Sequence, residues 1–414
     1  MKTPVTSSVI LLATITILLT TALGCDVTSN EQPSETPLRI GLLLNFTGSP
    51  EASADRQRAF ELAIQHVNEG GGVLGMPVEG VTADATQDPA AAVEAARRLV
   101  EVEGVHAIVG PNASSASLPV SQNVSGTLGI PTISPSATSP QLTGVEDSDY
   151  FFRTALSDAA QGPVLARVTR ERGFDSAGLI YQDDAYGQGL ADSFEEAWDG
   201  TLQVVSVAVG QTGFLPELEQ SASAGAQALV VIAFEDMALS IVREAIDTGT
   251  YDEFVFGDAA KRASLVREIG GEKLGDMYGT AGASSPANTA TADWEAAFIA
   301  EYGELPVLAY VKETYDATVA LALAAQAAGS LEGAAIRDHL RDIGAPPGRT
   351  VVGTPEGVAD GLSLLAEGQE IDFDGAASTL DWDESGDLRR GYIGVWRFTS
   401  DGRIEELDTV FFEN

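Results

Sequence analysis

Small hydroxyl residues follow two short apolar runs of the sequence, in the segments 110–115 and 134–138. Hydroxyl groups and the free backbone N–H groups at the start of a helix donate hydrogen bonds to an anion, so these segments are suited to a carboxylate. A serine or threonine in such a place can equally be a plain N-cap of its helix, and both interpretations stay open for each one. The candidate carboxylate-binding residues are Ser114, Ser115, Ser136, Ala137 and Thr138.

Aromatic and acidic residues follow the apolar runs in the next part of the chain. Tyr186, Phe234 and Asp258 each come shortly after such a run. A carboxylate pairs with an ammonium group and an aromatic face attracts a cation, so this set suits the positive end of a ligand. We therefore predict a cleft that holds a zwitterion, with its carboxylate and its ammonium group on the two sets of loops.

These loops need strands and helices to position them, and the apolar periodicity predicts a regular series of both. Short apolar runs alternate with amphipathic helical patterns, which indicates parallel sheets covered by helices on both faces. Ligands of such sheets bind beyond the carboxyl ends of the strands, where the candidate residues lie. The predicted strands are 40–44, 78–83, 106–109, 129–133, 177–181, 202–209, 228–233 and 254–256.

Two series of this kind, one before and one after residue 155, predict an α/β fold with two doubly wound parallel-sheet lobes. The C-terminal third of the chain has a different pattern. Helical patterns cover residues 294–301 and 309–328. Residues 375–412 have the pattern of antiparallel strands, with a turn at 383–387.

The chain has 414 residues and a strong excess of acids. Its 61 Asp and Glu outnumber its 23 Lys and Arg, which gives a formal net charge of −38. Such a charge repels phosphate backbones, so we exclude nucleic acid as a partner. The acids are dispersed and form no block, and we interpret them as a surface suited to solubility or to an ionic external medium.

No group of residues has the spacing of a metal site or of a catalytic site. The three histidines are scattered, and the sequence lacks a Gly-x-Ser-x-Gly elbow and a Walker loop. Residues 381–386 resemble the start of a calcium loop, but Tyr392 stands at the twelfth position, where that loop needs a bidentate Glu. We interpret this segment as an acidic hairpin turn, and we expect neither a cofactor nor an enzyme.

The first 24 residues have the features of a secretory signal peptide. Lys2 precedes an apolar run at 9–19, which is shorter than the ~20 residues that span a bilayer. Cys25, the only cysteine, follows small residues and resembles the acylated cysteine of a bacterial lipobox, so we predict lipidation there. The alternative is an ordinary signal peptide with a chance cysteine. The polar, aperiodic residues 25–37 predict a flexible tether.

The chain as a whole resembles the type I periplasmic binding proteins of ABC importers, specifically the leucine/isoleucine/valine-binding branch. The resemblance covers about residues 38–412. It implies two lobes joined by three hinge crossings near residues 155, 283 and 376. It implies one lobe at 38–155 plus 284–376 and the other at 156–283 plus 377–414. The segments that carry the resemblance are 72–78, 108–111, 133–143, 152–154, 184–189, 315–317 and 380–387.

The resemblance also implies roles for the candidate residues. Ser114, Ser136 and Thr138 match family positions that hold the carboxylate of the ligand. Tyr186 matches a tyrosine that lies against the ligand, and Asp258 falls at or beside the acid that grips the ammonium group.

Three departures from the family pattern concern the ligand pocket and the cysteines. Phe234 lacks the hydroxyl group that is often present at its position. Leucine-binding members often carry an aromatic residue in the first loop, whereas residues 52–54 are Ala-Ser-Ala, and the cysteine pair of some members is absent. The sequence therefore does not specify which side chain the ligand carries.

We expect a monomeric, lipid-anchored solute-binding protein outside the cytoplasm. Its ligand would be a branched-chain or related amino acid, and its partner an ABC permease in the membrane. Two alternatives remain. One is the same fold binding another small solute, such as an amide, urea or a carboxylic acid without an amine, and the other is an extracytoplasmic enzyme on the same architecture.

Overall fold

The computed structural model describes Met1, residues 36–306 and residues 308–413. The predicted signal peptide, the lipidation site at Cys25 and most of the predicted tether lie outside the described residues. Every helix and strand of the structure lies within residues 36–413.

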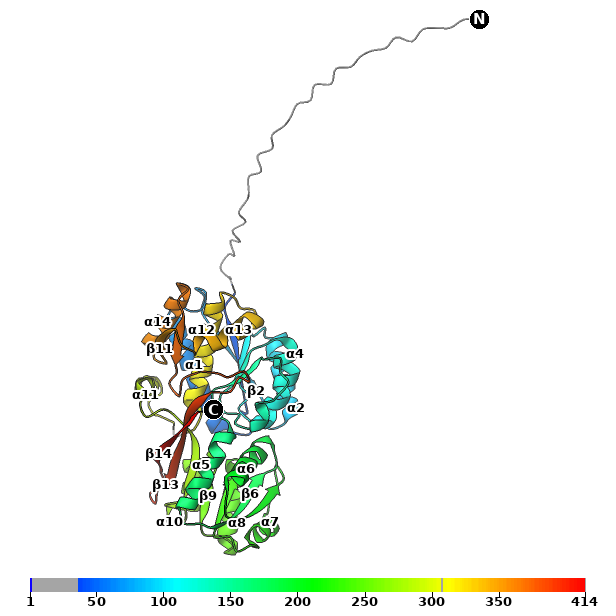
Figure 1. Cartoon of the computed structure of the whole chain (residues 1–414), viewed down its shortest axis with the longest axis vertical. Helices are drawn as coiled ribbons and strands as arrows, with labels where there is room; N and C mark the ends of the chain where they lie inside the picture. Colours follow the sequence, from blue (N-terminus) through cyan, green and yellow to red (C-terminus); the bar gives the residue numbers. More distant parts are fainter. Residues whose placement is uncertain (2–35, 307, 414) are drawn as a thin grey trace. The chain divides into compact units, whose positions relative to one another are not determined.

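The first sheet has five parallel strands in the order β2-β1-β3-β4-β5 (Figure 1). Strand β1, the second in this order, is buried on both faces, because Leu42 and Leu44 belong to one buried apolar cluster and Leu43 to another. This two-sided burial explains why the strand is a continuous apolar run in the sequence. The strands are β1 (Arg39–Leu44), β2 (Glu79–Asp84), β3 (Ala107–Val109), β4 (Thr132–Ser134) and β5 (Phe151–Arg153).

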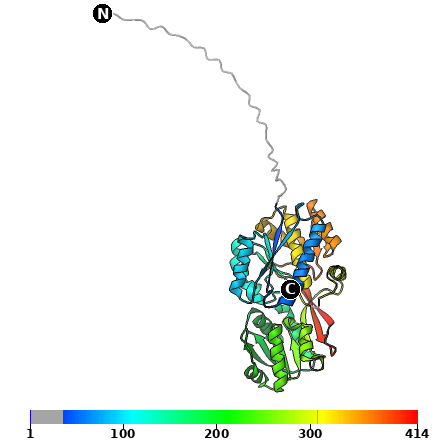
Figure 2. The same cartoon turned by 180° about the vertical axis from the view of Figure 1, so that it is seen from behind.

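The second sheet has seven strands in the order β14-β13-β10-β9-β8-β6-β7. The five strands from β6 to β10 run parallel, whereas β13 lies antiparallel to β10 and β14 lies antiparallel to β13. The C-terminal strands are the red ones in Figure 2. The predicted C-terminal antiparallel strands are confirmed. The strands are β6 (Ser176–Gln182), β7 (Thr201–Val207), β8 (Ala228–Ile232), β9 (Phe254–Phe256), β10 (Tyr278–Ala283), β13 (Arg390–Phe398) and β14 (Ile404–Glu413).

The acidic turn at 383–387 is present, but it does not connect β13 and β14. It precedes β13 and is closed by an isolated bridge between Trp382 and Leu388, while β13 and β14 are joined by residues 399–403. The turn forms because Asp383 Oδ1 accepts the backbone N–H groups of Ser385 at 2.8 Å and Asp387 at 3.0 Å.

Helices cover both sheets, and α12 is the most deeply buried of them. Nearly all of its residues from Val311 to Ala325 are buried, which explains its apolar sequence rich in Ala and Leu. The helices are α1 (Pro50–Glu69), α2 (Pro89–Glu101), α3 (Ser114–Val120), α4 (Gly126–Leu128), α5 (Asp158–Glu171), α6 (Ala185–Ala197), α7 (Leu215–Ala222), α8 (Glu235–Thr248), α9 (Ala263–Ile269), α10 (Gly271–Leu274), α11 (Thr289–Tyr302), α12 (Val311–Ala328), α13 (Gly333–Ile343) and α14 (Pro355–Ala366), with a π-helical turn at Ser121–Ser125 and 3-10 turns at Pro140–Leu142 and Asp258–Ala260.

None of the described helices is by itself long and apolar enough to cross a membrane. The pair α12 and α13 passes that test together, by length and composition, but it is bent by 108° at its break.

A small parallel ladder joins β11 (Arg349–Val352) to β12 (Ile371–Asp374) beside α14. The chain just after this ladder is held by α12. The buried carboxylate of Asp316 accepts the backbone N–H groups of Ala376 at 2.7 Å and Ala377 at 2.8 Å. The segment that leads toward the second sheet is therefore attached to a core helix of the first lobe.

The chain passes three times between the two sheets. It leaves the first sheet after β5, returns after β10 to helices that contact α1, β3 and β4, and reaches the second sheet again at β13. Before β13, Trp382 Nε1 donates to Arg153 O at 2.8 Å, so this stretch still contacts β5. The lobe boundaries at 155, 283 and 376 stay predictions.

Candidate ligand-binding cleft

A cavity lies where loops of both sheets meet, beyond the carboxyl ends of their parallel strands. Its empty volume is about 470 Å³, including the part that opens to solvent. This is the position at which open α/β sheets bind ligands. The cavity is lined by Ser49, Arg56, Asn112, Ala113, Ser114, Ser136, Tyr186, Phe234, Asp258, Ala259, Arg262, Ala309 and Tyr310.

Two loops of the first sheet bring hydroxyl groups to this cavity. Ser114 begins α3 just after β3, and Ser136 follows β4. The Ser136 hydroxyl donates to Asn112 O at 2.9 Å, and the Ser114 hydroxyl accepts the backbone N–H of Ser139 at 3.2 Å. Each loop thus holds a hydroxyl of the other, which fixes both at the cavity wall.

The turn after β3 needs a glycine at its first position. Gly110 has a φ of +116°, and a Cβ atom there would lie 2.1 Å from Leu43 O on the neighbouring strand. Only a residue without a side chain lets the chain pass this close to β1 and turn toward Ser114.

Three of the predicted carboxylate-binding residues do not line the cavity. Ser115 is half-buried on α3, while Ala137 and Thr138 are buried in the same loop as Ser136. The backbone N–H of Ala137 donates to Ser134 Oγ at 3.0 Å, so it is already used. The Thr138 hydroxyl faces the carboxyl group of Asp158 without meeting hydrogen-bond geometry.

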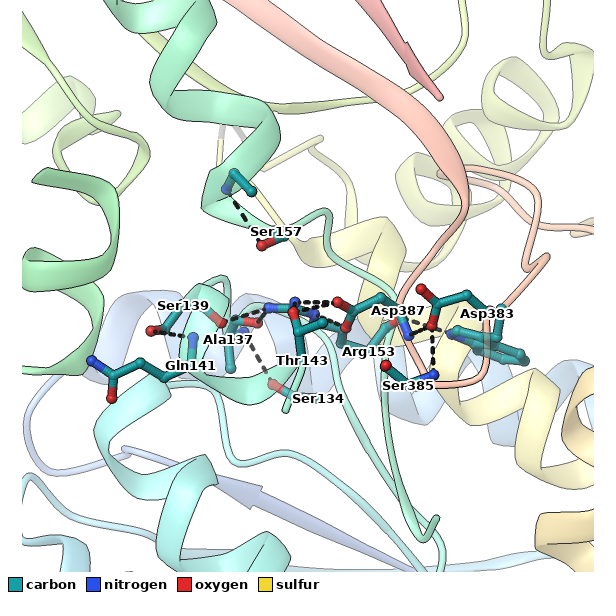
Figure 3. A network of polar contacts seen from close by, with 12 residues as sticks. Ser134, Ala137, Ser139, Gln141, Thr143, Arg153, Ser157, Asp383, Ser385 and Asp387 are labelled. Carbon is teal, nitrogen blue, oxygen red and sulfur yellow. Dashed lines mark hydrogen bonds and ion pairs between the residues drawn. The ribbon is translucent and has the colours of Figure 1, made fainter. Parts of the chain in front are cut away.

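An arginine anchors the loop that carries Ser136. The fully buried Arg153 of β5 donates through Nη1 to Ser139 O at 3.0 Å and through Nη2 to Asp387 Oδ2 at 2.7 Å (Figure 3). Its Nη1 also donates to Ala137 O at 3.3 Å. The guanidinium therefore ties the loop at the cavity wall to the segment that precedes β13.

Asp258 is the acidic group of the cavity, and three donors converge on its buried carboxylate. Tyr186 Oη donates to Oδ1 at 2.7 Å, Tyr310 Oη donates to Oδ2 at 2.9 Å, and Gln161 Nε2 lies 3.3 Å from Oδ1. Burial, and then the charge of Asp258, raises the pKa of both tyrosines well above the usual value. Both phenols thus stay protonated and keep donating to a carboxylate.

Three aromatic residues line the cavity together with this carboxylate, Tyr186 and Phe234 from the loops of the second sheet and Tyr310 from just before α12. Phe234 precedes α8, and its ring centroid is 5.2 Å from that of Tyr186, with the planes tilted by 38°. Tyr310 immediately precedes α12 and was not among the predicted residues. Its sequence signal was weak, because it follows no apolar strand.

A second acid, Asp158, lies near enough to Asp258 for the two charges to interact and forms no ion pair with the described residues, although the charge of Arg153 partly opposes the rise in its pKa. It is fully buried at the start of α5, and neither carboxylate oxygen has a hydrogen-bond partner. Burial, and then the nearby charge of Asp258, raises its pKa well above the usual value. This raised pKa favours the neutral form of Asp158.

Two arginines also line the cavity, and sequence reasoning missed both. Arg56 lies on the buried face of α1, at the helical spacing set by Ala52 and Ala59, and Arg262 immediately precedes α9. Arg56 lies inside a helix, whereas the candidate residues were predicted only at the ends of strands. A charged residue on a mostly apolar helix face was the available signal for Arg56.

No group of three His, Cys, Asp or Glu residues in the described part of the chain could hold a metal ion. Within the calcium-like segment, Asp383 caps its own turn and Asp381 Oδ1 lies 3.3 Å from Arg389 Nε, while Asp387, just after the segment, pairs with Arg153.

The chain matches the family model described as "Periplasmic binding protein" over residues 37–359. It is 30% identical to Leu/Ile/Val-binding protein homolog 1 of Brucella abortus over 76% of this chain and 84% of that protein. It is 26% identical to the chemotactic signal transduction system substrate-binding protein BasB of Halobacterium salinarum, covering 86% of each chain. The crystal structure of LivJ from Streptococcus pneumoniae with isoleucine matches with a TM-score of 0.75 and 24% identity, over 92% of this chain and 100% of that one, which shows the shared fold.

Proposed function

The chain belongs to the periplasmic binding protein family, and on that premise we propose that it is the solute-binding protein of an ABC importer with an amino acid as its ligand. A relative that is 30% identical is named a Leu/Ile/Val-binding protein homolog, which supports a branched-chain or related amino acid. The partner in this proposal is a permease in the membrane, and the binding protein itself acts as a monomer.

The observation that carries the proposal is the opposite chemistry of the two walls of the cleft. Hydroxyl groups of Ser114 and Ser136 line the first wall and suit a carboxylate. Asp258, with the rings of Tyr186 and Phe234 beside it, lines the second wall and suits an ammonium group. An α-amino acid carries both charges on one carbon atom and thus satisfies both walls at once.

Ligand capture would couple to closure of the two lobes. A ligand that contacts both walls gains all of its interactions only when the walls are close together, so it favours the closed arrangement. The three passages of the chain between the sheets are then the hinges, and the permease recognises the closed form.

We further propose that the protein is exported and held at the membrane surface by lipid on Cys25. The apolar run at 9–19 and the single cysteine after Gly24 support this. Replacing Cys25 by Ser should move the mature protein from the membrane fraction to the soluble fraction. An unchanged distribution would refute lipid anchoring through this residue.

A thermal-shift screen of the twenty amino acids tests the binding function. A ligand at a concentration 100 times its Kd stabilises the folded state by about 2.7 kcal/mol, which moves the melting temperature measurably. We expect at least one amino acid to do so at millimolar concentration. If none does, the amino-acid proposal is wrong, and the same screen with amides, urea and simple carboxylic acids would test the other solute classes.

A further inference from the structure

Two guanidinium groups face the same cavity. Arg56 reaches it from α1 in the first lobe, and Arg262 reaches it from the start of α9 in the second. Arg56 is buried and Arg262 is partly buried, and burial lowers the pKa of both, that of Arg56 to about 10. The charge of Arg262 lowers the pKa of Arg56 further, so the two cations lie close enough to repel each other.

The protein compensates these two charges unequally. Arg262 Nε lies 3.6 Å from Glu235 Oε2, a partly exposed carboxylate that also accepts from Ser264 Oγ. For Arg56, the described residues form no ion pair. Its Nη2 donates to Ala309 O at 3.3 Å, and its buried Nε has no partner.

Glu313 and Asp258 are the acids whose charges raise the pKa of Arg56, and neither forms an ion pair with it. Asp258 is engaged by the hydroxyl groups of Tyr186 and Tyr310. Burial raises the pKa of Glu313, which favours its neutral form. A buried charge without a partner is costly, so the cavity in this state is suited to receive an anion.

Building on the amino-acid function proposed above, we propose that the ligand has a second carboxylate, on its side chain, which Arg56 and Arg262 hold together. The ligand class is then an acidic amino acid. Its α-carboxylate lies against Ser114 and Ser136, its ammonium group against Asp258, and its side chain points toward the two guanidinium groups. Arginine is suited to this contact because its planar group binds a carboxylate through two parallel hydrogen bonds.

An aliphatic side chain fits these surroundings poorly. Residues 52–54, Ala-Ser-Ala, lie in the first turns of α1 and do not line the cavity, so that segment supplies no aromatic surface to the ligand. An aliphatic side chain of the ligand would also cover Arg56 without supplying a negative charge, and the guanidinium would then stay buried and unpaired. A ligand with a side-chain carboxylate removes that deficit.

Calorimetry of the whole mature protein with five compounds tests the assignment. L-glutamate and L-glutamine have the same shape and differ by one charge, L-aspartate is shorter, L-leucine is aliphatic, and glutarate lacks the amine. We expect an acidic amino acid to bind at least about tenfold more tightly than L-glutamine and L-leucine, a difference of 1.4 kcal/mol.

Two variants identify the residues responsible. Arg56→Gln should reduce the affinity for the acidic amino acid at least about tenfold and bring it close to that of L-glutamine. Arg58→Gln, on the same helix but outside the cavity and paired with Asp55, should leave both affinities unchanged. A melting curve without ligand checks that each variant is folded, and the comparison of L-glutamate with L-glutamine on the unmodified protein needs no variant.

The outcomes separate this inference from the function on which it rests. If L-leucine or L-glutamine binds as tightly as the acidic amino acids, the side-chain assignment is overturned while the amino-acid function stands. If glutarate alone binds, the amino-acid function is refuted and this assignment with it. Binding of none of the five also overturns the assignment, and the wider amino-acid screen then decides the function.

Discussion

The buried ion pair between Arg153 and Asp387 gives a quantitative test of what holds the cleft wall in place. We consider the change Asp387→Ala. It removes the partner of Arg153 Nη2 at 2.7 Å, the bond to Nε, and the acceptor of Thr143 Oγ1 at 2.6 Å. The side chain of Arg153 is 0% exposed, so water cannot replace the lost carboxylate without a structural change.

The expected cost follows from the contacts that are lost and those that remain. Two charge-assisted hydrogen bonds contribute about 1.5–3 kcal/mol each, and breaking a buried pair typically costs about 3–5 kcal/mol. Arg153 keeps the carbonyl groups of Ala137 and Ser139, which still stabilise its charge. We therefore expect a loss of about 3 kcal/mol, at the lower end of that range.

Equilibrium urea unfolding measures this loss as a lower transition midpoint at an unchanged slope. The matched control is Asp401→Ala, which breaks the exposed pair with Arg403 and should leave the midpoint unchanged. Replacing Arg153 and Asp387 together by Leu should recover part of the loss, because no unpaired charge remains. A loss below about 1 kcal/mol for Asp387→Ala would show that the guanidinium does not depend on this partner.

Three further predictions concern the ligand, the pH dependence and the backbone. Asp258→Asn should weaken binding of an α-amino acid by about 2–5 kcal/mol in calorimetry, whereas Asp276→Asn on the surface should not; equal affinities would refute an ammonium site at Asp258. Burial raises the pKa of Asp316 from 3.8 to about 8, so its contribution to stability is full below pH ~4 and is lost as the pH rises toward 8. The free energy of unfolding should therefore fall less between pH ~4 and pH 8 for Asp316→Asn than for the unmodified protein, as denaturation at several pH values would measure. The same pH dependence in both proteins would contradict the raised pKa of Asp316. Gly110→Ala should cost more than about 1 kcal/mol by strain at positive φ and contact with a backbone carbonyl, while Gly144→Ala, with open space around it, should be neutral in the same unfolding assay.

The sequence was sufficient for strands that are buried on both faces. Segments such as 40–44 and 228–233 are continuous apolar runs because helices cover both sides of each sheet, and the structure has strands there. β10 escaped prediction because its sequence, Tyr-Gly-Thr-Ala-Gly-Ala, has small residues where Trp396 and Tyr310 pack closely on its glycines. Tertiary packing, and not local apolarity, selects those residues.

The ends of the predicted strands indicated which loops form the cleft, but not which residues of each loop face it. Ser114 and Ser136 line the cavity, whereas Thr138 lies two residues farther along the same loop and faces Asp158 instead. Which residue of a loop faces the cavity depends on the turn that the loop makes, and the sequence pattern does not specify it. Arg56 and Tyr310 lie in or before helices, so only the folded chain brings them to the cleft.

The N-terminal part of helix α12 contacts two segments that lie far apart in the sequence, one at the ligand cleft and one before the second sheet. Tyr310, directly before its first residue, holds the carboxylate of Asp258, and Asp316, less than two turns later, holds the backbone at Ala376 and Ala377. A buried helix is stiff over this length, so a displacement at Tyr310 is transmitted to Asp316 and to the last passage to the second sheet. A ligand that displaces the Tyr310 hydroxyl from Asp258 and shifts this end of α12 would therefore also shift the buried anchor at Ala376 and Ala377, so occupancy of the cleft would change the backbone at a place that does not line it.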